Sequence, residues 1–253
     1  MQSSIGDSYR RAEAFLKAGR DVMFTGTPCQ ILGLKKYLRK DYENLLAVDF
    51  VCHGVPSPKV WQRYLNDISS TNVASAVTGV TFRDKVDGWL NYSFSLSASR
   101  DSKAGAQGPY VFREPFYKNL YMRAFLADFI LRPSCYACPA KDGSSCSDVT
   151  LGDFWGIERE NPSLFDDRGV SLVMIHNSKY RAVFNHCDAV EMGYTSALNG
   201  NPSIEYLVRK PINRPFFWFL FSNGRTLSHI LWMCQSSNLF ARLCRLVYRK
   251  LKA

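Results

Sequence analysis

The chain has 253 residues, of which 46% are hydrophobic and 14% aromatic, and its formal net charge is +10. This composition excludes a disordered protein, because a folded chain of this size buries roughly 70–75% of the surface that its unfolded form exposes. Neither a secretory leader nor an apolar run of the roughly 18–20 residues that a membrane-spanning helix needs is recognisable, so we expect a cytoplasmic protein.

The first 70 residues alternate between helical and strand patterns. Thr27, Pro28 and Gln30 predict a helix start, because a threonine cap, a proline at the first helical position and a glutamine three residues after the cap form a capping box. Strands that alternate with helices favour right-handed crossovers and a mostly parallel sheet. We expect helices over residues 5–20, 27–38 and from 57 onward, and buried strands over residues 22–25 and 45–52.

The middle of the chain predicts a hairpin and then a cysteine-rich loop. Strands over 77–83 and 89–99 read as an antiparallel pair, and residues 99–108, rich in Ser, Gly, Ala and Lys, predict a mobile surface loop. Further elements are expected as a helix over 115–130, strands over 149–154 and 171–176, a helix over 179–187 and a helical C-terminal third.

These patterns together predict an α/β fold. It has a mostly parallel central sheet with flanking helices, an added antiparallel hairpin and a helical C-terminal extension. We expect a division into residues 1–200 and a basic, aromatic extension over 201–253.

Eight cysteines are the first indication of function. A reducing cytoplasm disfavours disulfides, so metal or cluster binding is the better interpretation. Cys135 and Cys138, with Cys146 after them, lie in a loop where two thiolates can bind one centre from the same side. The competing interpretation is a redox dithiol, although such a pair usually opens a helix that follows a strand, and this one follows a helix.

Two further cysteines are expected at one edge of the sheet. Cys29 lies in the first turn of a predicted helix and Cys52 at the carboxyl end of a predicted strand, which is the edge where parallel sheets bind ligands. Each alone reads as a buried small hydrophobic residue. With the loop pair they make four thiolates, a set that zinc and a 4Fe-4S cluster both accept; the setting at strand–helix junctions favours a cofactor site over a zinc staple.

Four ordered motifs carry a resemblance to a known family. They are residues 26–30 (Gly-Thr-Pro-Cys-Gln), 51–58 (Val-Cys-His-Gly-Val-Pro-Ser-Pro), 132–138 (Arg-Pro-Ser-Cys-Tyr-Ala-Cys) and 148–156 (Asp-Val-Thr-Leu-Gly-Asp-Phe-Trp-Gly). Over about residues 2–200 the chain resembles the coenzyme F420 hydrogenase/dehydrogenase beta-subunit family, in the bacterial branch found with polysaccharide biosynthesis loci.

The resemblance implies an iron-sulfur flavoprotein oxidoreductase with a 4Fe-4S cluster beside FAD. By motif, the cluster ligands would be Cys29, Cys52, Cys135 and Cys138, with Cys146 in reserve. Electrons would pass on to a hydride-accepting small molecule, a deazaflavin or another acceptor. Relatives commonly carry a ferredoxin-like segment ahead of this region. We therefore expect a partial or shortened chain that depends on a redox partner protein or ferredoxin as electron donor.

The same motifs supply candidate flavin contacts. Helix-opening residues could cradle the flavin pyrophosphate, although capping alone also explains them. His53 and Asp153 are candidate catalytic groups, and a structural histidine and a turn aspartate are their alternatives. An aromatic ring after a strand could stack near the flavin or fill the core. The full set of candidate flavin contacts is Gly26, Thr27, Pro28, Gln30, Gly54, Asp153, Phe154 and Trp155.

The end of the chain is strongly basic. Residues 204–253 contain nine Lys or Arg and one acidic residue. This pattern fits either an ordinary solvated helix face or a helix that lies on an acidic partner or a membrane surface. No nucleic-acid partner is expected. The alternative to the redox function is a zinc-stapled or catalytically silent binding module in polysaccharide assembly.

Overall fold

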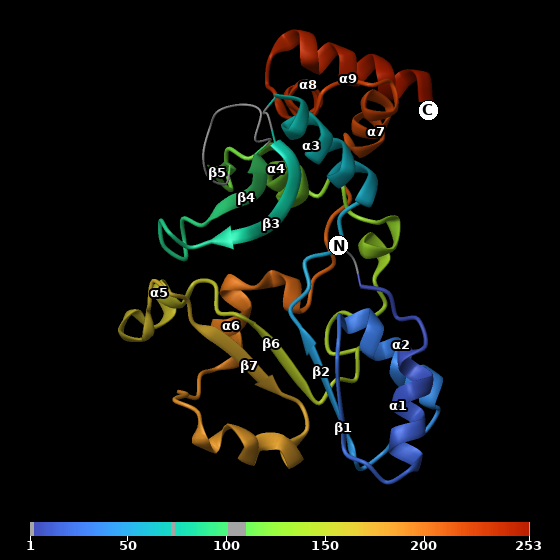
Figure 1. Cartoon of the computed structure of the whole chain (residues 1–253), viewed down its shortest axis with the longest axis vertical. Helices are drawn as coiled ribbons and strands as arrows, with labels where there is room; N and C mark the ends of the chain where they lie inside the picture. The colour runs from blue at the N-terminus through green and yellow to red at the C-terminus, as the bar shows by residue number, and fades with distance from the viewer. Residues whose placement is uncertain (1–2, 72–73, 101–109, 253) are drawn as a thin grey trace. The chain divides into compact units, whose positions relative to one another are not determined.

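The computed structural model describes residues 3–71, 74–100 and 110–252 (Figure 1). The chain forms two compact units, and it crosses between them three times. The first unit combines residues 1–54 with 133–208, and the second combines residues 55–132 with 209–253. The predicted division into a cofactor domain over residues 1–200 and a C-terminal extension over 201–253 stays a prediction.

The first unit is built on a four-stranded sheet with the order β1-β2-β6-β7. β1, β2 and β6 run parallel, and β7 pairs antiparallel with β6 at one edge, which confirms the predicted mostly parallel sheet. The strands are β1 (Val22–Thr25), β2 (Leu45–Phe50), β6 (Val149–Asp153) and β7 (Ser171–Ile175).

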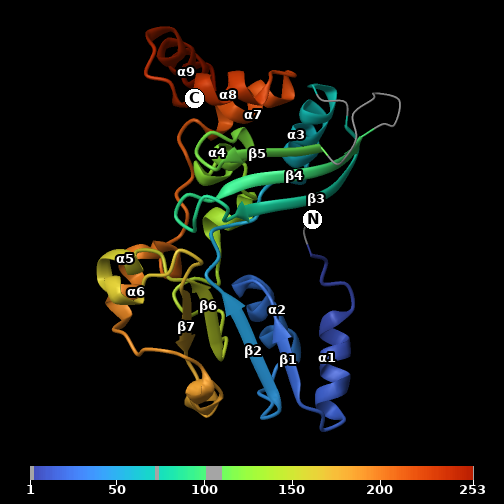
Figure 2. The same cartoon turned by 60° about the vertical axis from the view of Figure 1, so that its left-hand side comes forward.

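Two helices cover the β1 side of this sheet. α1 (Ser8–Lys17) and α2 (Pro28–Leu38) lie beside β1 and β2, as Figure 2 shows. Their apolar faces meet in a core of Ala12, Leu16, Leu34, Leu38 and Leu45. The helix start predicted at Thr27 is confirmed: Gln30 Oε1 accepts a 2.9 Å hydrogen bond from the Thr27 backbone N–H, as in a capping box.

The rest of the first unit consists of short helical turns. The predicted α-helix over 179–187 is a 3-10 helix, η4 (Ser178–His186), and none of its residues is buried. Most of the stability of an α-helix in a protein comes from packing of a buried face. Because η4 has no buried face, nothing stabilises the α-helix over the tighter 3-10 helix. The other turns are η2 (Pro133–Ala137), α5 (Ile157–Glu160), η3 (Pro162–Leu164), α6 (Tyr194–Gly200) and η5 (Pro202–Ile204).

The second unit opens with α3 (Pro58–Thr71) and an antiparallel sheet of order β3-β4-β5. The predicted hairpin is confirmed as β3 (Ala74–Asp84) paired with β4 (Ser93–Arg100). The predicted loop over 99–108 lies almost entirely outside the described residues.

One helix prediction is wrong at its start. Residues 110–115 form a third strand, β5 (Tyr110–Pro115), and the helix is shorter, α4 (Leu120–Leu126). Asn119 sets the beginning of α4, because its side-chain oxygen accepts a 3.1 Å hydrogen bond from the Met122 N–H. β5 pairs with the free side of β4, a non-local contact that helical periodicity alone does not reveal.

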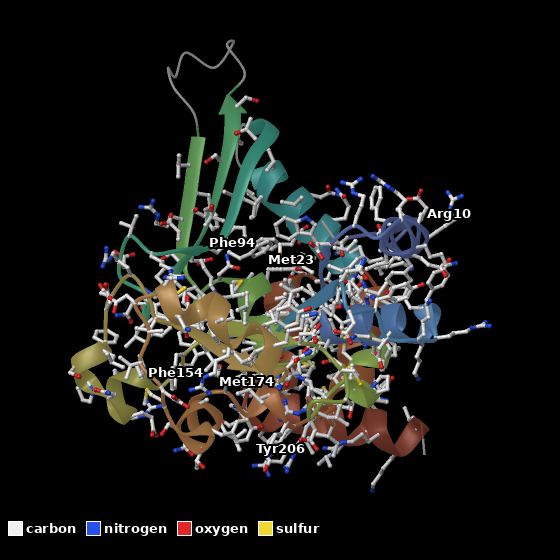
Figure 3. All side chains as sticks on the ribbon, turned by 90° about the horizontal axis from the view of Figure 1, so that it is seen from below. Arg10, Met23, Phe94, Phe154, Met174 and Tyr206 are labelled. Atoms are coloured by element: carbon white, nitrogen blue, oxygen red, sulfur yellow. The ribbon has the colours of Figure 1, made fainter. Side chains whose placement is uncertain are left out.

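Aromatic rings fill the core of the second unit. Phe94, labelled in Figure 3, is fully buried, and the rings of Trp61 and Tyr64 lie with centroids 6.2 Å and 5.7 Å from it. Three C-terminal helices complete this unit and confirm the predicted helical C-terminal third. They are α7 (Arg214–Ser222), α8 (Leu227–Gln235) and α9 (Leu239–Lys252). No helix within the described ranges is both long enough and apolar enough to span a bilayer.

The end of α6 approaches the turn after β6 more closely than a side chain allows. A Cβ atom added to Gly200 would stand 1.4 Å from the Trp155 carbonyl oxygen. The backbone of α6 therefore packs directly on residues 155–156, the end of the family-like motif at 148–156.

We predict that Gly200→Ala lowers the free energy of unfolding by about 3 kcal/mol, because the turn at Trp155 must move to admit the methyl group. Urea denaturation of the full chain measures this. Gly193→Ala at the other end of α6 is the matched control, since an added Cβ there meets nothing within 4 Å. Equal stability of the two variants would contradict the close approach.

Candidate cofactor site

The strand register brings two of the predicted cysteines, Cys29 and Cys52, to one edge of the sheet. Cys29 is the second residue of α2, just after β1, and Cys52 follows the end of β2, so the parallel pairing of β1 with β2 places both at carboxyl ends, as predicted. β6 enters the sheet late, because Val149 pairs with Val48, the fourth residue of β2. Cys135 and Cys138 lie in the segment before β6, and β6 begins opposite the carboxyl half of β2.

Electrostatics link the four thiols. Cys52 is half-buried, and burial raises its pKa to about 11, with further upward contributions from Cys135, Cys29 and Cys138. Interactions between charges weaken with distance, so the three thiols that act on Cys52 belong to its neighbourhood. Cys29 is exposed, and Cys135 and Cys138 are half-buried.

Lys141 is the positive group beside these thiols. Its Nζ donates hydrogen bonds of 2.6 Å to the Cys52 carbonyl oxygen and 2.5 Å to the Ser203 carbonyl oxygen. Burial lowers the pKa of Lys141, and Cys52, Cys138 and Cys135 oppose that shift. Lys141 was not among the site residues predicted from the sequence, although a lysine three positions after a cysteine pair was a visible signal.

The opening of α2 supports Cys29 through its neighbours. The Thr27 hydroxyl lies 3.2 Å from Cys29 Sγ, and the Tyr9 hydroxyl donates a 2.7 Å hydrogen bond to the Gln30 carbonyl oxygen. Burial raises the pKa of Tyr9, and so does the charge on Cys29. A Cβ on Gly26 would stand 2.9 Å from Gln30 Oε1, so glycine at 26 leaves room for the cap.

A cavity of about 210 Å³ opens next to Cys52 within the first unit. Met174, labelled in Figure 3 on β7, is one of its walls, and Pro28 is the candidate flavin contact that lines it. The cavity also has polar walls. They include Asp49, Lys141, Ser145, Thr150, His176 and Tyr194.

Three of these polar side chains form a hydrogen-bonded chain. Thr150 Oγ1 donates to Asp49 Oδ1 at 2.5 Å and lies 2.9 Å from His176 Nε2. Asp49 is only 2% exposed, so the hydroxyl satisfies a carboxylate removed from solvent. This hydrogen-bonded chain was missed in the sequence analysis. A charged residue within a buried strand was the available signal, whereas Thr150 lies on β6 and His176 follows β7.

The remaining cysteines differ in their exposure. Cys146 is exposed, has a left-handed backbone with φ of 57°, and is not among the thiols that act most strongly on Cys52. Its role as reserve ligand stays a prediction. Cys187 is exposed, and Cys234 is buried in α8, where burial raises its pKa to about 12.

The candidate flavin contacts come from several segments of the first unit and differ in burial. Phe154 is 5% exposed, so its ring packs inside the protein, and Asp153 and Trp155 flank it at the end of β6. His53 and Gly54 follow Cys52 and are half-buried. Their roles toward a flavin stay predictions. Within the described ranges, no three His, Cys, Asp or Glu side chains are grouped closely enough to hold a single metal ion.

The parallel sheet presents Cys29 and Cys52 at its carboxyl edge, which is where α/β proteins bind ligands. Residues 19–200 match the family model that describes the C-terminal part of the coenzyme F420 hydrogenase/dehydrogenase beta subunit. The chain belongs to this family, and the family assigns it an oxidoreductase role. No curated protein matches the sequence.

We predict that Thr150→Val lowers the free energy of unfolding by about 1–3 kcal/mol, because it leaves the buried Asp49 carboxylate without the hydroxyl donor. Urea denaturation measures the loss. Thr81→Val, on an exposed position of β3, is the control with the same change of side chain and should unfold within about 0.5 kcal/mol of the unaltered protein. A Thr150→Val protein as stable as the control would mean that Asp49 does not depend on this hydroxyl.

Proposed function

We propose that the protein is an iron-sulfur flavoprotein oxidoreductase in which Cys29, Cys52, Cys135 and Cys138 hold a 4Fe-4S cluster. The observation that carries the proposal is the parallel strand register, which brings Cys29 and Cys52 to one edge of the sheet, where Cys135 and Cys138 also raise the pKa of Cys52. The four cysteines come from three separate segments of the first unit, and coincidence is a poor explanation for such convergence. A four-iron cluster binds each thiolate through a different iron atom, so its ligands stand farther apart than those of one ion.

The surroundings of the thiols suit a negatively charged centre. Lys141 brings one positive charge to the site and is held by two carbonyl oxygens, one of them that of Cys52. Charges and hydrogen bonds near the cluster ligands tune the potential of iron-sulfur centres. Thr27, whose hydroxyl contacts Cys29 Sγ, would contribute a hydrogen bond to the same ligand sulfur.

FAD is the second cofactor of the proposal. Bound together, the two cofactors supply the conversion between single-electron and hydride transfer. The start of α2 at Gly26 and Thr27 is the candidate contact for the flavin pyrophosphate, and Asp153 and Trp155 are candidate contacts for other parts of the flavin. His53 stays the candidate proton donor.

The cavity beside Cys52 suits a small polar acceptor or part of one. Its volume of about 210 Å³ lies below the roughly 300–1,000 Å³ of drug-sized ligand pockets, so it fits a fragment of a deazaflavin rather than the whole molecule. His176 and Thr150 form a hydrogen-bonded route from the cavity wall to Asp49, on which a proton can be held or moved.

The proposal includes an external electron donor, a redox partner protein or ferredoxin, and a small-molecule hydride acceptor. A cytoplasmic location accords with the use of free thiols as cluster ligands, because that compartment keeps thiols reduced. A role in polysaccharide biosynthesis rests only on the bacterial branch that the sequence resembles.

We predict that anaerobic reconstitution with iron and sulfide gives about four iron atoms per chain and a brown protein. Serine at any one of the four ligand positions should lower the bound iron, because a serine hydroxyl is a poor ligand for iron-sulfur clusters. Cys187→Ser is the matched control, an exposed cysteine that should leave the iron content unchanged. Cys146→Ser in the same series tests the reserve ligand.

A colourless protein with stoichiometric zinc would contradict the cluster and favour the zinc-stapled module. A folded protein that binds neither iron nor zinc would favour the catalytically silent relative. Retention of full iron content by the Cys52→Ser variant would overturn the ligand set itself.

We predict that Asp153→Asn weakens FAD binding about tenfold, because a hydrogen bond to a charged group is worth about 1.5–3 kcal/mol. Quenching of flavin fluorescence on titration with the reconstituted protein measures the affinity. Asp188→Asn, an exposed aspartate of the same unit, is the control for the loss of one charge. Equal affinities of the two variants would remove Asp153 from the flavin site, and absence of any FAD binding would reject the flavoprotein assignment.

A further inference from the structure

The last helix of the second unit has two apolar faces. One packs inward against α7 and α8 (Figure 1). Ala241 is fully buried, and the ring of Tyr248 lies 5.1 Å from the rings of both Phe216 and Phe219. Arg245 is 9% exposed and donates hydrogen bonds to the Met233 and Ser236 carbonyl oxygens, so this face is anchored by polar contacts too.

The opposite face of α9 is apolar and open to solvent. Its positions repeat with the spacing of one helix face, three, four or seven residues apart. The exposed fractions are 69% for Leu239, 61% for Phe240, 51% for Leu243, 47% for Leu246, 55% for Val247 and 79% for Leu251. Scattered exposed hydrophobic residues are ordinary, whereas a contiguous stripe of six on one helix indicates a binding surface.

The charges around this stripe are of one sign. α9 contains no acidic residue, and Arg242 and Arg249 lie seven positions apart along one flank of the stripe. Lys250 is exposed near its end. An apolar stripe bordered by cations is complementary to a surface that is apolar inside and anionic outside.

We propose that α9 docks the protein peripherally on an anionic lipid surface, with Leu239, Phe240, Leu243, Leu246, Val247 and Leu251 inserted at the headgroup boundary. The helix lies in the plane of the interface. Arg242, Arg249 and Lys250 pair with lipid phosphates, and the inward face keeps its packing on α7 and α8. This role is independent of the redox chemistry, since α9 lies outside the family match over 19–200.

The charge distribution favours an anionic lipid surface over a second copy of this chain. A second copy of this chain would bring its own basic flanks against the first, and like charges at such a contact repel each other. An anionic bilayer offers an apolar interior for the stripe and negative charge for its basic flank. Each basic residue near such a surface raises the binding affinity roughly fivefold.

Vesicle flotation of the full chain tests the proposal. We expect binding to vesicles of phosphatidylcholine with phosphatidylserine, at least about tenfold weaker binding to phosphatidylcholine alone, and loss of binding at high salt. Leu243→Glu with Val247→Glu should lower binding to the anionic vesicles at least about tenfold, because two inserted side chains become charged.

The matched control is Val183→Glu with Val190→Glu, two valines of the first unit that are 58% and 59% exposed. It adds the same charge and should leave binding unchanged. Circular dichroism of both double variants establishes that they fold. Equal binding to both kinds of vesicle, no binding to either, or equal losses in the two double variants would overturn the proposal. So would sedimentation equilibrium that shows a dimer which Leu243→Glu with Val247→Glu dissociates, because a second copy would then cover this face.

Discussion

The parallel pairing of β1, β2 and β6 is the constraint on which the candidate site depends. Its register makes β1 and β2 end side by side and makes β6 begin opposite Val48, so three chain segments reach the same edge of the sheet. A buried carboxylate fixes this register. Asp148 is 7% exposed, and it accepts hydrogen bonds from the Ala47 backbone N–H at 2.8 Å and from Asn177 Nδ2 at 2.9 Å. It thereby ties the start of β6 to β2 and to the segment after β7, and a buried charge of this kind is tolerated only with such partners.

The reactive side chains of the first unit are positioned by the strands of this sheet. Cys29 and Cys52 lie at its carboxyl edge because each follows the end of a parallel strand, and Lys141 lines the same cavity as the Asp49–Thr150–His176 chain. Each buried polar group of this set has a hydrogen-bond partner, which is the condition for keeping such groups away from water. One thiol, that of Cys52, lines this cavity together with a lysine and a hydrogen-bonded polar chain, in a protein that belongs to an oxidoreductase family.

The second unit is organised differently. Its antiparallel sheet and α3 enclose an aromatic core, and its last three helices pack on one another through apolar and aromatic side chains. α9 is apolar on both faces: its inward face carries packed side chains and one buried arginine, and its outward face is apolar and exposed. A surface in contact with water normally carries polar residues outward, so the exposed apolar face points to a surface used for contact.

Local signals along the chain were enough to establish the main secondary structure and the chemical class. The capping box at Thr27, the alternation of strands and helices and the spacing of Cys135 and Cys138 are such signals, so they predicted α2, the parallel sheet and a redox-type thiol set. Features that depend on distant contacts emerged only from the folded structure: the strand β5, which was not predicted and pairs with β4, and the 3-10 form of η4, which lacks a buried face. Lys141, Thr150 and His176 also became visible only in space. Their partners lie far along the chain, for example 101 residues between Asp49 and Thr150, and no local pattern records such a separation.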